Sequence, residues 1–184
     1  LRDLLEQNNL SDLDKYNIYS ILAQAATNMQ QFENAISYLK KSLEVGLKPE
    51  KIYRNKFLLS QLYERKKIKD TAFTEYSEII DFNRKIPREF YIQSFLKKSN
   101  VTDSLSLSVS ELSDLIKDFE NNKFLDIINF QLAKLYLNEY KLKEQKEFEL
   151  KSIGFFNKSL EQNSSDNYLV SRNYLNLACL LYTS

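Results

Sequence analysis

Glycine and proline are almost absent from this sequence, and that constrains the fold more than any motif does. The 184 residues include only 2 Gly and 2 Pro. An all-β protein of this length needs many turn residues, and a nucleotide-binding α/β fold needs glycine-rich phosphate loops. Helices need neither residue inside their length, since both lower helix stability. We therefore predict an all-α chain made of a nearly unbroken series of helices.

The amino-acid composition limits the classes of partner that we expect. Hydrophobic residues make up 43% and charged residues 28% of the chain, enough to bury a core or several stacked units. Lys and Arg number 26 against 25 Asp and Glu, so a net charge of +1 gives no electrostatic reason to expect nucleic acid or an anionic membrane surface as partner. No apolar run approaches the roughly 18 residues of a membrane span, so we expect no direct membrane insertion of this stretch.

The two ends of the sequence look like those of a fragment. Leu1 is not a methionine and stands inside an apparent helix (LRDLLEQNNL), so any export signal would have to lie upstream. The last six residues, Cys179 to Ser184, can be encoded by a sequence that matches a common transposase adapter used for sequencing libraries. The alternative is that they continue an apolar helix. In either case a single cysteine cannot form an internal disulfide.

Alanines recur at regular places in the stretch AQAATNMQQFENAISYLKKSLE, which otherwise has the pattern of two amphipathic helices. It resembles the tetratricopeptide repeat, W-x2-L-G-x2-Y, then A-x3-F, then P, over about 34 residues. The first part of that pattern falls on Tyr19, Leu22, Ala23 and Ala26, the second on Ala35 and Leu39, and Pro49 follows. Two antiparallel helices approach closely only where small side chains face each other. We therefore interpret the alanines as packing points between paired helices.

The same frame recurs further along the chain. Thirty-seven residues later, Leu59, Ser60 and Tyr63 take the first-helix places, and Ala72 and Tyr76 the second-helix places. A third copy has Leu132, Ala133 and Tyr136, but its second helix has Gln145 where alanine belongs and Glu149 where an aromatic belongs, so we expect it to be degenerate or shifted. A fourth first helix carries Tyr174, Leu177 and Ala178.

The long interval between the second and third copies predicts one further helix pair. Residues 88–98 can form a short apolar helix, and residues 104–120 a second, with Ser108 as its start signal paired with Glu111. One face of that second helix would carry Leu105, Val109, Leu112 and Ile116. We predict a single right-handed α-solenoid over residues 1–184, of units 14–48, 50–86, 87–122 and 124–162 and a partial unit 167–184.

The sequence offers little catalytic chemistry. It contains no histidine, which excludes a Ser-His-Asp or Cys-His mechanism and a histidine metal site in this piece. The carboxylates Glu144, Glu147 and Glu149 alternate with lysines, a pattern typical of a solvated helix face. The 12 Tyr and 12 Phe mostly stand at core spacing. We therefore predict no enzyme activity, no catalytic residue, no metal site and no cofactor.

A solenoid of this kind offers a concave surface lined by the first helix of each pair, and we expect partner binding there. The inward-facing residues in this frame are Asn17, Ser20, Gln24 and Asn28 in the first unit, Arg54, Phe57, Gln61 and Glu64 in the second, and Ile127, Phe130, Lys134 and Leu137 in the third. We expect Phe57, as an exposed aromatic, and Phe130 to anchor a peptide or a partner helix, and the amides to bind backbone. The alternative is that each residue packs against a neighbouring turn.

The carboxylate clamp of chaperone-binding repeat proteins is not matched, since Ser20 and Gln24 stand in its place. The order of the segments FENAISYLKKSLE, KFLLSQLYERKKIKDTAFTEYSEII, FLDIINFQLAKLYLNEY and SSDNYLVSRNYLNLA resembles the long repeat lipoprotein of Bacteroidota type IX secretion and gliding motility (the PorW/SprE type) over about residues 14 to 178. This resemblance implies a lipoprotein on the periplasmic face of the outer membrane that links the secretion motor to other parts of the machine.

A second class of function stays open at this point. The same repeats would suit the peptide- or partner-sensing region of a bacterial signalling protein, in which case a cytoplasmic location is expected. A lipoprotein signal upstream would favour the scaffold, and a helix-turn-helix, membrane span or long coiled coil downstream would favour the sensor. Both hypotheses predict protein or peptide partners.

Overall fold

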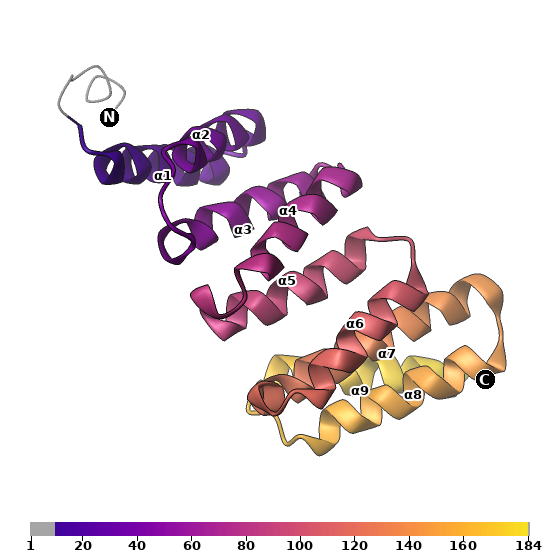
Figure 1. Cartoon of the computed structure of the whole chain (residues 1–184). Coiled ribbons are helices and arrows are strands. Elements are labelled where there is room, and N and C mark those ends of the chain that lie inside the picture. The colour runs from indigo at the N-terminus through magenta and orange to yellow at the C-terminus, as the bar shows by residue number, and fades with distance from the viewer. Residues whose placement is uncertain (1–9, 184) are drawn as a thin grey trace. The chain divides into compact units, whose positions relative to one another are not determined.

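A computed structural model describes residues 10–183, and all regular structure in that range is helical (Figure 1). The α-helices are α1 (Asp12–Asn28), α2 (Phe32–Glu44), α3 (Pro49–Arg65), α4 (Lys69–Phe82), α5 (Arg88–Val101), α6 (Leu105–Lys117), α7 (Leu125–Lys143), α8 (Lys146–Glu161) and α9 (Asn167–Thr183), with 3-10 helices η2 (Asn83–Lys85) and η3 (Phe119–Phe124). The predicted all-α class is confirmed for these residues. The helix expected around LRDLLEQNNL falls on residues 1–9, outside the described range.

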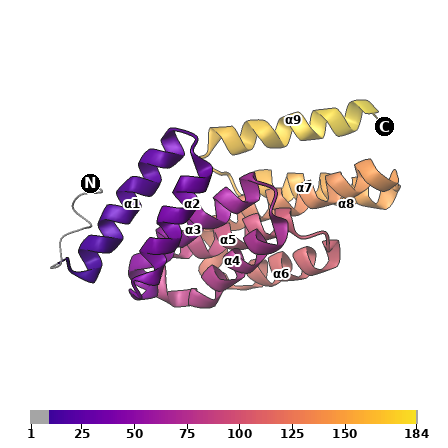
Figure 2. The same ribbon diagram turned by 90° about the horizontal axis from the view of Figure 1, so that it is seen from above.

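The described helices form two compact units. Unit 1 contains α1 to α5 and ends at Thr102, and unit 2 begins at Asp103 and contains α6 to α9. In unit 1 each helix packs on the next along the chain, and α3 also contacts α5; in unit 2 α7 packs on both α6 and α8, and α8 on α9 (Figures 1 and 2). The predicted single solenoid and the predicted unit 87–122 depend on how the two units are placed, and they stay predictions. None of the helices in the described range is both long and apolar enough to span a membrane.

The turn between α1 and α2 has the same backbone geometry as the turn between α3 and α4. Gln30 and Lys67, 37 residues apart, have left-handed φ angles of 59° and 61°. In each turn the next residue donates its N–H to the carbonyl oxygen five positions back, at 2.8 and 3.0 Å, which is the Schellman arrangement that ends a helix. The 37-residue recurrence predicted from the alanines is therefore confirmed in the backbone.

Small residues occupy the contacts between paired helices, as the spacing predicts. Ala23 on α1 and Ala35 on α2 have no exposed surface, and neither do Ser60 on α3 and Ala72 on α4. The even-numbered helices share one buried pattern, in which a small residue is followed by a large apolar residue four positions later and by another buried residue seven positions later. Its members are Ala35, Leu39 and Ser42; Ala72, Tyr76 and Ile79; Ser108, Leu112 and Leu115; and Ser152, Phe156 and Ser159.

The second helix of the third copy is shifted rather than degenerate. Gln145, the residue expected at the small-residue place, is the exposed N-cap of α8, and Ser152 takes that place with no exposed surface. The cause is the length of the preceding helix. α7 continues for ten residues after Ala133, whereas α1 ends five residues after Ala23. The turn therefore comes five residues later. Ser152 also lies nine residues after the end of α7, whereas Ala35 lies seven after the end of α1, so the pattern of α8 moves seven residues along the chain.

The start of α6 also differs from the prediction. Ser104, not Ser108, is the N-cap, and its hydroxyl accepts a hydrogen bond from the backbone N–H of Leu107 at 3.3 Å. Ser108 lies inside the helix and is 1% exposed, because it holds the small-residue place of the buried pattern. Serine is suited both to an N-cap and to a small buried place. The spacing of Ser108 to Glu111 alone therefore predicted the wrong N-cap.

One hydrogen bond joins successive helix pairs in the same way in both units. Asn55 on α3 donates to the hydroxyl of Ser42 on α2 at 2.9 Å, and Asn173 on α9 donates to the hydroxyl of Ser159 on α8 at 3.0 Å. Each serine lies seven residues after the small residue of its helix. All four side chains are buried, so each bond satisfies polar groups that would otherwise be costly inside the core. The repeat frame is therefore present in unit 1 and unit 2 alike.

Candidate functional site

The two predicted aromatic anchors pack inside their own units. The Phe57 ring is part-buried and lies with its centroid 5.4 Å from that of Phe90 on α5, at an interplanar angle of 84°. Phe130 on α7 is 4% exposed, and the guanidinium of Arg172 on α9 lies 4.9 Å from its ring centroid. The expectation that Phe57 is exposed is wrong, and Phe130 does not line an open surface. Both rings stand three residues before the buried small residue of their helix, a place that contacts the next odd-numbered helix.

Ser20 holds the corresponding place on α1 and is also used internally. Its hydroxyl accepts a hydrogen bond from the Asn55 amide on α3 at 2.6 Å and donates one to the carbonyl oxygen of Tyr16 at 2.6 Å. Nearby, the Tyr16 hydroxyl donates to the carbonyl oxygen of Lys51 at 2.8 Å. These bonds place α1 and α3 side by side. For Ser20, Phe57 and Phe130, packing against a neighbouring turn is therefore the interpretation that the structure supports.

The Glu64 carboxylate bonds to residues inside unit 1. The buried phenol of Tyr76 on α4 donates a hydrogen bond of 2.7 Å to its Oε2, and the ammonium of Lys97 on α5 lies 3.8 Å from the same atom. Burial raises the pKa of the Tyr76 phenol, and the bonded Glu64 carboxylate raises it further. The three residues therefore link α3, α4 and α5.

The remaining predicted residues of unit 1 lie at its surface. Asn17, Gln24 and Arg54 are exposed, and Gln61 is half-buried. The Gln24 amide donates to the Asn28 side chain, one turn along the same helix, at 3.0 Å. The Arg54 Nε donates to the neighbouring Tyr53 hydroxyl at 3.1 Å. These bonds to neighbours on the same helix hold the side chains in place without covering them. Lys134, the other polar candidate, lies half-buried on α7 in unit 2.

α5 contributes residues that the sequence interpretation missed. Ser94 is fully buried and follows Ser60 by 34 residues, the usual length of the repeat, which was the available signal. In this frame Arg88 stands at the place of Arg54, and Tyr91 and Phe95 follow on the same side of α5. The guanidinium of Arg88 lies 4.4 Å from the ring centroid of Tyr91, whose ring in turn packs edge-on against Phe95 at 5.2 Å.

The odd-numbered helices of unit 1 together form a surface of amides, guanidiniums and aromatic rings, which we name the α1–α3–α5 surface. Its members are Asn17, Gln24, Arg54, Gln61, Arg88 and Phe95, of which the first three are exposed and the others part-buried. Tyr91 stands at the place of Phe57 and packs against the core of unit 1. Amides can pair with the backbone of an extended peptide, guanidiniums bind carboxylates, and rings stacked with guanidiniums give apolar contact area. These are groups that can contact an extended peptide.

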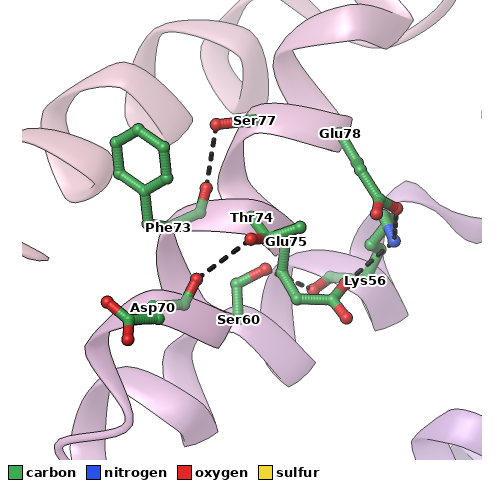
Figure 3. A network of polar contacts seen from close by, with 8 residues as sticks. All are labelled: Lys56, Ser60, Asp70, Phe73, Thr74, Glu75, Ser77 and Glu78. Carbon is green, nitrogen blue, oxygen red and sulfur yellow. Dashed lines mark hydrogen bonds and ion pairs between the residues drawn. The ribbon is translucent and has the colours of Figure 1, made fainter.

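A second polar cluster lies between α3 and α4 and is structural (Figure 3). Lys56 is 8% exposed, and its ammonium lies 2.8 Å from Glu75 Oε2 and 2.6 Å from Glu78 Oε2. Burial alone would lower the pKa of Lys56, but the bonds to the two carboxylates outweigh it and raise the pKa above its usual value. The hydroxyl of Ser60 donates to the Lys56 carbonyl oxygen at 2.8 Å, so the cluster borders the helix contact.

The described residues provide no candidate for a metal centre. Among residues 10–183 no group of three or more His, Cys, Asp or Glu side chains is arranged to hold a metal ion. No protein-family model matches the chain, and no curated protein matches it. The α1–α3–α5 surface is the candidate site considered below.

Proposed function

We propose that this chain is a non-catalytic protein–protein interaction scaffold built of tetratricopeptide-like helix pairs stacked as an α-solenoid. The observation that carries this proposal is the α1–α3–α5 surface, whose residues stand at equivalent places of successive pairs. Arg54 and Arg88 are 34 residues apart and each lies beside a tyrosine ring, at 5.8 and 4.4 Å from the ring centroid. Repetition of one chemistry along adjacent helices suits an elongated partner that contacts several pairs at once.

The second part of the proposal concerns the secretion apparatus to which the scaffold would belong. The order of helical segments resembles the repeat lipoprotein of type IX secretion and gliding motility, which supports a role on the periplasmic side of the outer membrane. The Asn55 to Ser42 and Asn173 to Ser159 bonds support the repeat frame on which that resemblance depends. The expected partners are then components of the secretion motor and other periplasmic proteins.

A capture experiment with surface variants tests the proposal. The full chain is immobilised, incubated with extract of the native organism, and the bound proteins are identified by mass spectrometry. A Gln24→Ala/Gln61→Ala/Arg54→Ala variant is expected to lose bound partner, because it removes amide and guanidinium groups from the surface. Asn157→Ala on α8 and Lys40→Ala on α2, both exposed and outside this surface, are matched controls that should bind as the parent chain does.

The identity of the captured proteins decides between the two functions. Recovery of secretion-motor or periplasmic proteins, weakened by the triple variant and not by the controls, supports the type IX scaffold. Recovery of cytoplasmic signalling proteins alone, with the same dependence, favours a sensing region instead. Equal binding by every variant contradicts the assignment of the α1–α3–α5 surface as the partner site.

A further inference from the structure

The outward side of α9 carries apolar side chains that are open to solvent. Tyr174 is 61% exposed and Leu181 67%, and Ala178 between them is exposed as well. The opposite side of the helix is buried in unit 2, where Leu169 and Asn173 are 6% and 1% exposed. One side of α9 is therefore buried and the other exposed, and the exposed side carries apolar residues as well. An apolar helix face open to water is unfavourable unless another surface covers it.

The bond between Asn173 and Ser159 fixes the place of Ala178 in the repeat frame. Its counterpart in unit 1 is made by Asn55, which precedes the fully buried Ser60 by five residues, and Asn173 precedes Ala178 by five. Ala178 thus stands at the small-residue place of its helix. On α1, α3 and α7 that place has no exposed surface, because the following even-numbered helix packs on it.

The residue four positions earlier contacts the following helix on α1 and on α3. On α1 this residue is Tyr19, and the ammonium of Lys41 on α2 lies 5.9 Å from its ring centroid. On α3 it is Lys56, which pairs with Glu75 on α4 at 2.8 Å. On α9 it is the exposed Tyr174.

The residue three positions after the small residue follows the same rule. Ala26, Tyr63 and Tyr136 hold this place on α1, α3 and α7, and all three are buried. The Tyr136 ring stacks on Phe155 of α8 with a centroid distance of 5.7 Å. On α9 the equivalent residue is Leu181, which is exposed. On α9 the residues at these three equivalent places, Tyr174, Ala178 and Leu181, are all exposed.

We propose that Tyr174, Ala178 and Leu181 form a docking face for an amphipathic helix with the buried pattern of the even-numbered helices. The partner helix would carry Ala or Ser at its contact with Ala178, a large apolar residue four positions later, and a third buried residue seven positions later. The face itself contains no charged residue. Arg172, the charged residue of α9, has its guanidinium over the rings of Phe130 and Tyr168 instead. Recognition therefore depends on shape and apolar contact.

A peptide with the sequence of residues 31–45 is the probe of choice. It contains α2, which already packs on a tyrosine at the place of Tyr174 and carries Lys41 above that ring. In fluorescence anisotropy with the full chain, the labelled peptide is expected to bind. Ala178→Leu should weaken binding by about tenfold or more, since overpacking a close helix contact disfavours it. Cys179→Ser, at an exposed neighbouring residue, is the matched control and should leave binding unchanged.

A graft tests the same face without relying on a free peptide. Replacing Tyr182–Ser184 with a copy of Thr27–Val45 puts the grafted alanine twelve residues after Ala178, as Ala35 follows Ala23. The grafted chain is expected to melt at a higher temperature than the parent and to be monomeric in analytical ultracentrifugation. The same graft with its Ala35 equivalent changed to Leu should lose the gain in melting temperature.

Three outcomes would overturn the proposal. Peptide binding that Ala178→Leu does not weaken would mean that the peptide binds elsewhere. Equal melting temperatures for the two grafts and the parent would show that the added helix does not dock. Self-association that persists in the grafted chain and is abolished by Leu181→Asp would show that a second copy of the chain occupies the face instead.

Discussion

The hydroxyl of Ser152 on α8 donates a hydrogen bond of 2.9 Å to the carbonyl oxygen of Ala133 on α7. Both residues have no exposed surface, so the bond lies where the two helices approach most closely. Serine is small enough for this contact and can satisfy its hydroxyl on the opposite backbone, which alanine at the equivalent Ala35 and Ala72 need not do. The bond therefore defines the register of α8 against α7.

Enlarging Ser152 should destabilise unit 2. Ser152→Leu adds apolar bulk at a fully buried helix contact and is expected to lower the free energy of unfolding by about 1–3 kcal/mol, measured by urea unfolding followed by circular dichroism. Gln145→Leu changes the exposed residue that the sequence frame had placed there, and it should shift stability by less than about 0.5 kcal/mol. The reverse result, with Gln145 sensitive and Ser152 tolerant, would contradict the register of α8.

The sequence alone identified the helices and most of their packing points. Alanines at 23, 35 and 72 were assigned correctly because a small residue at a helix contact leaves a periodic signal. Ser152 and Ser108 were missed because serine also caps helices and occurs on exposed faces, so its burial is not evident from its type. The extra length of α7 could not be predicted either, since the lysine-rich stretch around Glu144 is compatible with a helix or with a turn.

Removing the amide of Asn55 should weaken the joint between the first two helix pairs. Asn55→Ala leaves the buried hydroxyl of Ser42 without a hydrogen bond donor, and it also removes the bond to Ser20. The expected loss in free energy of unfolding is about 1–3 kcal/mol. Asn17→Ala, at an exposed amide on α1, is the matched control and should change stability by no more than about 0.5 kcal/mol. Equal effects of the two variants would argue against a structural role of the joint.

The buried ammonium of Lys56 should stabilise unit 1 in a pH-dependent manner. Lys56→Met leaves Glu75 and Glu78 without their cation and is expected to cost about 1–3 kcal/mol at pH 7, less than for a fully buried pair because the Glu78 side chain is 53% exposed. The folded-state pKa of Lys56 is raised above its ordinary value of 10.5. Its contribution is therefore fully present below that value and is lost as the pH rises through the folded-state pKa.

The corresponding measurement compares the parent chain with Lys56→Met by urea unfolding at several pH values. The stability difference should be constant between pH 7 and pH 9 and should decrease above about pH 10.5. A Lys56→Met/Glu75→Met double variant should recover part of the loss, because it removes an unpaired carboxylate together with the cation. A difference that grows with rising pH would have the wrong sign for this cluster.

Small-to-large changes at the alanine contacts test the repeat frame of unit 1. Ala35→Leu and Ala72→Leu should each lower the free energy of unfolding by about 1–3 kcal/mol, because both side chains are fully buried between paired helices. Ala25→Leu, at an exposed position on α1, serves as control. Unchanged urea midpoints for both buried alanines would show that the helices do not approach one another at these points.

The candidate site was harder to predict than the fold, and Phe57 shows why. Sequence periodicity places a residue on one side of a helix, but whether that side faces solvent depends on the next odd-numbered helix. Ser20, Phe57 and Phe130 all meet a residue of that helix, namely Asn55, Phe90 and Arg172 respectively. Gln24 and Arg54 are exposed, as the frame predicts, because a polar side chain there has no core to enter. Their role in partner binding stays a prediction.

Truncation of the Phe57 side chain should therefore lower the stability of unit 1, whether or not it changes partner binding. Its ring packs against Phe90 on α5 and, with a centroid distance of 5.8 Å, against Tyr76 on α4. Phe57→Ala is expected to lower the free energy of unfolding by about 2–4 kcal/mol, near the lower end for buried aromatic truncations because the ring is only part-buried. Phe57→Leu keeps most of the apolar volume and should cost less than half as much. The Gln24→Ala/Gln61→Ala variant should melt like the parent chain, so it can report on partner binding without a loss of stability. A Phe57→Ala chain with parental stability would mean that the ring is free for a partner after all.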